Sequence, residues 1–147
     1  MAGELYRIAY YSHSLIEGSA SEVRNAVVTL AKNAQKRNAA HSVSGALVFD
    51  DGCFAQVLEG ELSAVERIFT SIQRDTRHCD LQILEYEPIE KRSFSNWSMG
   101  LINEKITERH GHGSLFEPKQ LRLIQKFQNG LTDYLLLLAR EQARASG

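Results

Sequence analysis

The fold is decided by the stretch Cys53-Phe54-Ala55-Gln56-Val57-Leu58-Glu59-Gly60, which has the pattern of a β-strand with one polar residue out of place. Side chains alternate between the two faces of a strand, so Gln56 shares a face with Phe54 and Leu58. That face has the character of a core face, and a buried carboxamide without partners costs about 1–3 kcal/mol. We therefore expect a polar partner for Gln56, which can be another protein group, a water or a bound ligand.

The residues before this stretch predict two further strands. Asp51-Gly52 separates it from an apolar run at 43–49, and such a dipeptide favours a two-residue hairpin because the turn needs positive φ. Near the N-terminus, apolar residues alternate between two faces over 5–11, which predicts an opening strand with Tyr10 near its end.

Two helices are predicted by capping-box spacing followed by an apolar stripe. Ser19 precedes Glu22 by three residues, and Ser63 precedes Glu66 in the same way. In this motif the hydroxyl accepts from a free N–H of the first turn and the carboxylate reaches back. Apolar residues then recur at helical spacing, which predicts helices over about 20–37 and 62–74.

Two more strands, at 81–86 and 97–101, complete the order β-α-β-β-α-β-β. This order predicts an α+β fold of the ferredoxin-like type, with both helices on one face of the sheet. A polar, Gly-rich linker is expected over 103–114. Helical stretches over 115–145 are expected to pack on the free face of the sheet, or on another copy of the chain.

Composition limits the functional classes. The chain has 147 residues, 24% of them charged, and a formal net charge of -1, so it has no bulk electrostatic footprint for nucleic acid or an anionic membrane. It shows no apolar run long enough to span a bilayer and no signal-peptide pattern. Cys53 and Cys79 fit no metal-ligand spacing, so no metal is expected. Reduced thiols in a cytoplasmic protein are expected, with a disulfide as the alternative.

Two strings of residues carry a family resemblance. One is F-x-Q-x-L-E-G at 54–60 and the other is R-x-F-x-x-W-x-M at 92–99. Together with Tyr10-Tyr11-Ser12, Asn38, Gly45 and Asp75-Thr76-Arg77-His78, in this order, they resemble the BLUF family of blue-light sensors that use FAD. The resemblance covers residues 4–103, which it marks as an FAD-binding photosensor domain. It implies a flavin held noncovalently between the two predicted helices.

The resemblance also assigns roles to individual residues. Tyr10 matches the redox-active tyrosine, Gln56 the switching glutamine, and Asn38 a side chain that bonds the polar edge of the flavin. The remaining positions belong to three groups. They are Val27, Leu30 and Phe54 along the flavin ring, Arg37, Asp75, Arg77 and His78 near its polar tail, and Trp97 and Met99 as the signal relay, of which either can lie next to Gln56.

The implied mechanism produces a signal and no net reaction. Tyr10 would give an electron and a proton, relayed by Gln56, to the excited flavin. A carboxamide can donate through nitrogen or accept through oxygen. Gln56 would therefore return rotated or tautomerised, with a new hydrogen bond to the flavin C4 carbonyl that red-shifts the absorption. No catalytic residue and no enzymatic activity are expected.

The signal is expected to reach a separate effector protein of unknown identity, and a homo-oligomer is expected. Only about 44 residues follow Asn103, too few for a cyclase or phosphodiesterase domain. Two alternatives stay open. A small flavin-dependent oxidoreductase would bleach with an electron donor instead of shifting its absorption, and a ferredoxin-like interaction module without flavin would be colourless. Taken singly, Tyr10, Gln56 and Asn38 also fit ordinary roles as a strand tyrosine, a core amide and a helix cap.

Overall fold

A computed structural model describes residues 3–50, 52–95, 100–102, 132, 135, 136 and 140 of the chain. Its elements follow the predicted order β-α-β-β-α-β-β and confirm the α+β class. They are β1 (Leu5–Ser14), α1 (Ala20–Ala40), β2 (Ser44–Asp50), β3 (Cys53–Glu61), α2 (Leu62–Arg74), β4 (His78–Pro88) and β5 (Gly100–Ile102).

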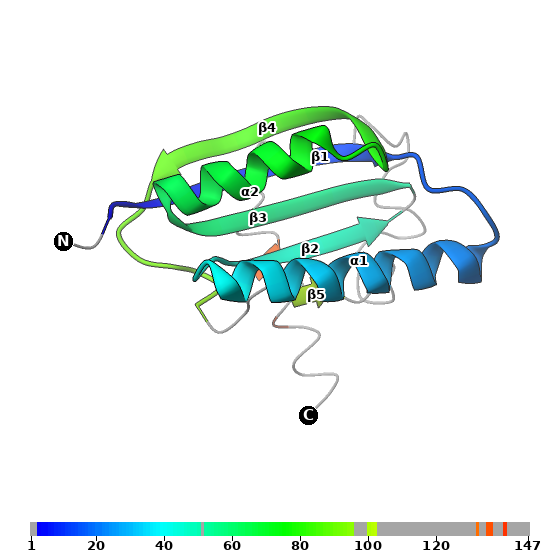
Figure 1. Cartoon of the computed structure of the whole chain (residues 1–147), viewed down its shortest axis with the longest axis horizontal. Coiled ribbons are helices and arrows are strands. Elements are labelled where there is room, and N and C mark those ends of the chain that lie inside the picture. The colour runs from blue at the N-terminus through cyan, green and yellow to red at the C-terminus, as the bar shows by residue number, and fades with distance from the viewer. Residues whose placement is uncertain are drawn as a thin grey trace.

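The strands form one sheet in the order β4-β1-β3-β2-β5. The first three pairings in that order are antiparallel, and β5 joins the edge of β2 in parallel. Both helices lie on the same face of this sheet, as predicted (Figure 1). The central strands are β1 and β3, so the two residues singled out in the sequence, Tyr10 and Gln56, lie in the middle of the sheet.

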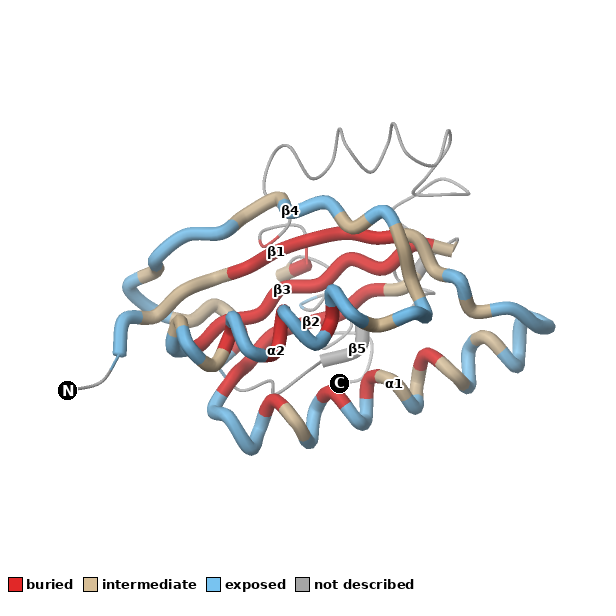
Figure 2. The backbone as a smooth tube through the Cα atoms, turned by 45° about the horizontal axis from the view of Figure 1, so that its top comes forward, coloured by how far each residue is buried: buried red, intermediate tan, exposed pale blue. Residues whose placement is uncertain are grey.

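Side chains that alternate along the strands separate two hydrophobic clusters, one on each face of the sheet. On the helix-covered face, Ile8 and Tyr10 pack with Phe54 and Leu58. The opposite face, called the free face below, carries a second cluster of buried residues. Its members are Ala9, Tyr11, Ala46, Val48, Cys53, Ala55, Val57, Phe94 and Leu135. Burial is continuous along the central strands, whereas the outer sides of the helices are exposed (Figure 2).

Leu135 connects the C-terminal region with the free face. Its side chain is completely buried in the free-face cluster, and Leu136 is partly buried against the same cluster. The prediction that the C-terminal region packs on the free face is therefore confirmed for these residues. The predicted linker over 103–114 and the rest of the extension predicted over 115–145 lie outside the described residues, apart from Thr132 and Arg140.

The two predicted capping boxes have different outcomes. Ser19 caps α1 as expected: its side chain accepts from the N–H of Glu22, whose carboxylate accepts from the N–H of Ser19. The second capping box is wrong. Strand β3 continues to Glu61 and the helix begins at Leu62, with no side-chain hydrogen bond at the cap, so Ser63 already lies inside the first turn.

The turn between β2 and β3 has the predicted form. Asp50 pairs with Cys53 across the hairpin, and Gly52 has a φ of 79°, in the region that favours glycine. The close approach of the two strands also explains Gly45, because a Cβ atom there would lie 1.9 Å from the carbonyl oxygen of Val57. Strand β4 extends beyond the predicted 81–86 at both ends, and β5 begins at Gly100 in the described part of the chain.

Candidate functional site

The sheet places Tyr10 directly opposite Gln56, because β1 and β3 are antiparallel neighbours in this register. The Tyr10 hydroxyl donates a hydrogen bond to Oε1 of Gln56. The two side chains are only 4% and 3% exposed. The expectation that Gln56 has a polar partner is confirmed, and this partner is a protein group.

This pair forms one wall of a pocket between the sheet and the two helices. The empty space in the pocket measures about 390 Å³, including the part that is open to solvent. The residues that line the pocket come from both helices, from the strands β1 to β4 and from the turn between α2 and β4. They are Tyr10 from β1, Leu30, Ala34 and Arg37 from α1, Leu47 from β2, Phe54 and Gln56 from β3, Ile72 from α2, and Asp75, Arg77 and His78 from the end of α2 to the start of β4.

All but two of the expected cofactor-binding residues line this pocket. Val27 is buried in the helix-side cluster, and Asn38 is buried near the end of α1, where its Oδ1 accepts from Nε of Arg37 at 3.3 Å. The side chains expected to relay the signal, Trp97 and Met99, lie outside the described residues.

Sequence reasoning missed three apolar residues of the pocket, Ala34, Leu47 and Ile72. Ala34 and Ile72 belong to the apolar stripes that predicted the two helices, and Leu47 lies in a predicted strand. Their periodicity showed that they face inward. Periodicity alone does not separate a residue that packs against protein from one that faces a pocket, so no signal in the sequence distinguished them.

A short turn after α2 supplies the polar end of the pocket. Arg77 donates to both carboxylate oxygens of Asp75, with Nε 2.9 Å from Oδ1 and Nη2 2.5 Å from Oδ2. The backbone N–H of Arg77 also donates to Oδ1 of Asp75, at 2.9 Å. These hydrogen bonds hold the pKa of Asp75 below its ordinary value. The turn therefore contributes a hydrogen-bonded pair of opposite charges to the lining of the pocket.

His78 is oriented by hydrogen bonds at both ring nitrogens. Its Nε2 lies 2.7 Å from the carbonyl oxygen of Ile72, and its Nδ1 lies 2.7 Å from Oγ of Ser12. A carbonyl oxygen can only accept, so Nε2 carries a proton. The second hydrogen bond joins Nδ1 to the Ser12 hydroxyl, which can donate or accept. These contacts connect β1, α2 and β4 at the wall of the pocket.

The electrostatics of the pocket keep the Tyr10 phenol protonated. Burial raises the pKa of Tyr10 well above its ordinary value, the nearby Arg37 guanidinium opposes this shift, and Asp75 adds to it. Burial also lowers the pKa of Arg37 from its ordinary value, and the negative charge of Asp75 opposes this shift. The pocket thus combines a buried neutral proton donor with a partly desolvated cation.

The chemistry of this lining suits a flavin dinucleotide. Leu30, Leu47 and Phe54 offer apolar surface for a planar ring system, and the Gln56 carboxamide offers both a donor and an acceptor to its polar edge. Arg37 and Arg77 supply positive charge for a diphosphate. Apolar walls with a few polar groups are typical of cofactor sites.

Among the described residues, His, Cys, Asp and Glu side chains form no group of three or more that could hold a metal ion. None of the described helices combines the length and the apolar character that crossing a membrane requires.

Comparison with known proteins gives a consistent result. A family model described as "BLUF: Sensors of blue-light using FAD" matches residues 5–100. The photoactivated adenylate cyclase subunit beta of Euglena gracilis is 33% identical over 76 residues, which cover 51% of this chain and 9% of that protein. The chain thus matches less than a tenth of that relative's length.

Solved structures show the same fold over most of the chain. The structure of BlsA in its photo-activated state has a TM-score of 0.65 and 29% sequence identity, and the match covers 87% of this chain and 94% of that one. The dark-state structure of BlrB, a BLUF protein, has a TM-score of 0.73. That match covers 95% of this chain and 99% of the other, at 24% sequence identity.

Proposed function

Because the chain belongs to the BLUF family, the sensors of blue light that use FAD, we propose that its signal is a rearrangement of the Tyr10–Gln56 hydrogen bond. One observation carries this proposal: a buried phenol donates to a buried carboxamide at the wall of a pocket that suits a flavin. Neither side chain needs this bond for packing alone, since apolar residues of similar shape would fill the same space.

We propose that different residues in and beside the pocket contact different parts of FAD. Val27, Leu30 and Phe54 cover the ring, while Gln56 and Asn38 meet its polar edge. The polar tail is held by Arg37, Asp75, Arg77 and His78. FAD supplies the absorption of blue light and, once excited, an acceptor for an electron. Support comes from the position of seven of these residues on one pocket and from the buried Asn38 beside Arg37.

In this proposal the proton stays on Tyr10, and the group of Gln56 that faces the phenol changes. Tyr10 keeps its proton on Oη because burial raises the pKa of the phenol. In the structure that proton points to Oε1 of Gln56. Rotation of the carboxamide by half a turn would place Nε2 against Tyr10, which would then have to accept. The groups that Gln56 offers to the pocket would change with the same rotation.

We propose that residues 4–103 form the photosensor, that residues 115–145 form an extension, and that Trp97 and Met99 relay the signal to a separate effector protein. A homo-oligomer in the cytoplasm is part of the same proposal. Cys53 and Cys79 form no disulfide with each other, which suits a reducing compartment. The named relative from Euglena gracilis is a photoactivated adenylate cyclase subunit, and the region matched by this chain is 9% of its length.

A light-minus-dark absorption spectrum of the purified protein tests this function. We expect a yellow protein whose absorption shifts reversibly to the red under blue light. Gln56→Leu should keep the colour and lose the shift, while the exposed Gln35→Leu on α1 should keep both. A normal shift in Gln56→Leu would overturn the proposal. Bleaching by an electron donor would support an oxidoreductase, and a colourless protein would support an interaction module.

A further inference from the structure

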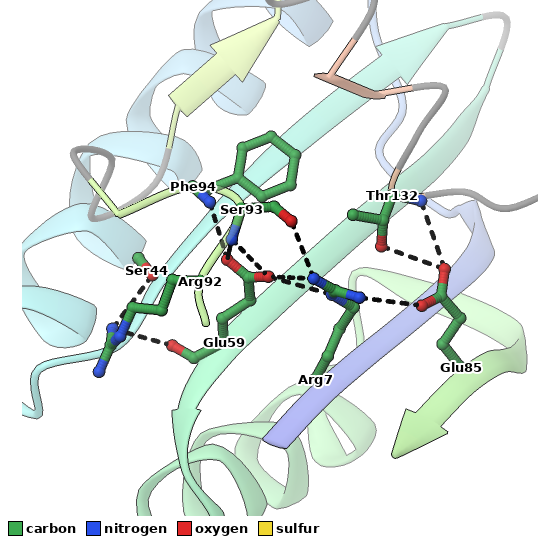
Figure 3. A network of polar contacts seen from close by, with 8 residues as sticks. All are labelled: Arg7, Ser44, Glu59, Glu85, Arg92, Ser93, Phe94 and Thr132. Carbon is green, nitrogen blue, oxygen red and sulfur yellow. Dashed lines mark hydrogen bonds and ion pairs between the residues drawn. The ribbon is translucent and has the colours of Figure 1, made fainter. Parts of the chain in front are cut away.

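A buried carboxylate on the free face of the sheet holds the segment that leads toward β5. Glu59 is completely buried on β3 (Figure 3). Its Oε1 accepts from the backbone N–H groups of Ser93 and Phe94, both at 2.9 Å. Arg92 strengthens this attachment, because its Nη1 donates to Oγ of Ser44 at 3.1 Å and to the carbonyl oxygen of Glu59 at 3.2 Å. Arg92, Ser93 and Phe94 are thus all hydrogen-bonded to Glu59 on β3, and Arg92 also to Ser44 on β2.

The guanidinium of Arg7 lies between two carboxylates, one on each side. Its Nε and Nη2 donate to Oε2 of Glu59 at 3.0 and 2.8 Å, and Nη2 also donates to Oγ of Ser93 at 2.9 Å. On the other side, its Nη1 lies 3.8 Å from Oε2 of Glu85 on β4. Only 13% of the Arg7 side chain is exposed, so it is partly desolvated.

The second carboxylate reaches the C-terminal region. Oε1 of Glu85 accepts from the backbone N–H of Thr132 at 3.3 Å and from its Oγ1 at 3.1 Å. The figure shows these contacts as one continuous path from Thr132 through Glu85, Arg7 and Glu59 to the Ser93 backbone (Figure 3). Three strands, β4, β1 and β3, each contribute one charged residue to this path. We call this set of five residues the charged path.

The position of the charged path relates it to the candidate switch. Glu59 follows Gln56 by three residues on β3, so the two side chains leave the strand on opposite faces. Ser93 and Phe94 precede the segment that contains Trp97 and Met99 and continues into β5. The far end, at Thr132, lies three residues before Leu135, which is buried with Phe94 in the free-face cluster.

We infer that the charged path couples the C-terminal region to the segment that leads to β5, with Arg7, Glu59 and Glu85 as positioning residues. Glu85 holds one edge of the Arg7 guanidinium, and Thr132 holds Glu85. Loss of the Thr132 hydroxyl removes one of the two hydrogen bonds from Thr132 to Glu85. Glu85 then restrains Arg7 less, and Arg7 holds Glu59 and Ser93 less firmly. The guanidinium of arginine is a rigid planar group, so a movement at one of its edges also moves the donors at the other edge. That this path carries a light signal rests on the proposed function.

Amide hydrogen exchange of the full chain in the dark, resolved by residue with NMR, tests the coupling without any photochemistry. Thr132→Val removes the hydroxyl at one end of the charged path, and Ser93→Ala removes the hydroxyl at the other. Thr70→Val and Ser71→Ala, both exposed on α2, are matched controls. The N–H of Val57 in β3 serves as the reference for opening of the whole domain.

We expect Thr132→Val to accelerate exchange at the Ser93 and Phe94 amides at least about threefold relative to Val57, within the range of coupling in one hydrogen-bond network. Coupling is reciprocal, so Ser93→Ala should accelerate exchange at the Thr132 amide. Thr132→Ser keeps the hydroxyl and should restore the wild-type rates. Exchange at Ser93 and Phe94 that is equal in Thr132→Val and Thr70→Val would overturn the coupling.

The optical measurement separates this inference from the proposed function. In a protein that shows the red shift, Thr132→Val should change the recovery rate in the dark at least about threefold while leaving the dark spectrum unchanged. An unchanged recovery rate with altered amide exchange would refute the signalling role of the charged path and leave the proposed function intact. A protein without any red shift would refute the proposed function, and the amide exchange would still decide the coupling.

Discussion

The hydrogen bond between Tyr10 and Gln56 allows a quantitative prediction for stability. Tyr10→Phe keeps the ring and removes the hydroxyl, so the 3%-exposed Gln56 loses the donor to its Oε1. A buried polar group that loses its partner costs about 1–3 kcal/mol. Gln56→Leu has the complementary effect, because it leaves the hydroxyl of the 4%-exposed Tyr10 without this acceptor. Each single variant should therefore lose about 1–3 kcal/mol of the free energy of unfolding.

The double variant separates a hydrogen bond from two independent packing defects. Tyr10→Phe with Gln56→Leu removes the donor and the acceptor together, and replacement of both partners by apolar groups can be nearly neutral. We expect the double variant to be more stable than the sum of the single losses predicts, by about 1 kcal/mol or more, as for residues in direct contact.

Urea unfolding followed by circular dichroism measures these differences. It should be performed at two FAD concentrations, so that stabilisation by bound ligand can be subtracted. Tyr86→Phe is the control, because Tyr86 is 46% exposed and donates to the exposed Glu66. It should change the free energy of unfolding by no more than about 0.5 kcal/mol. Strictly additive losses in the double variant would refute the argument that the bond couples the two side chains.

Four further results follow from the fold and the site. Acid precipitation should release all the yellow colour, because binding of FAD is expected to be noncovalent; colour in the pellet would contradict this. Burial raises the pKa of Tyr10 in the folded protein above its value of about 10 in the unfolded chain. The resulting contribution to stability is fully present below about pH 10. As the pH rises above 10, the free energy of unfolding should fall by up to about 1.4 kcal/mol per pH unit. Urea unfolding should show a smaller fall for Tyr10→Phe over the same pH range. Leu135→Ala should destabilise the fold by about 2–5 kcal/mol, whereas Leu15→Ala, at a side chain 53% exposed, should have little effect in the same assay. Gly45→Ala should lower the yield of folded protein or its thermal midpoint, because the new Cβ would meet the Val57 carbonyl; an unchanged midpoint would contradict this.

Much of the fold was predictable because its signals are local. The alternation around Gln56, the Asp51-Gly52 turn and the Ser19 capping box each depend on a few neighbouring residues, and each indicated its element correctly. The same reasoning failed at Ser63, where the spacing of a capping box is present but β3 runs directly into α2. A cap forms only where the backbone is free to leave the helix, and the preceding strand removes that freedom here.

The identity of the site also came from the sequence, through the order of residues that resembles one family. The family model matches residues 5–100 and agrees with that interpretation. The residues on the polar turn, Asp75 and Arg77, and the pair Tyr10 and Gln56 do lie on one pocket. The apolar members Ala34, Leu47 and Ile72 were not separable from the core, because a side chain that faces a pocket and one that faces protein have the same periodicity.

Only the tertiary structure decided which distant residues meet. Tyr10 and Gln56 are separated by 46 positions, and their hydrogen bond exists because β1 and β3 are neighbours in one particular register. Arg7 and Glu59 are separated by 52 positions, yet they form the buried centre of the charged path. A local pattern fixes which face a side chain occupies. Its partner depends on the pairing of strands, which is set by the free energy of the whole sheet.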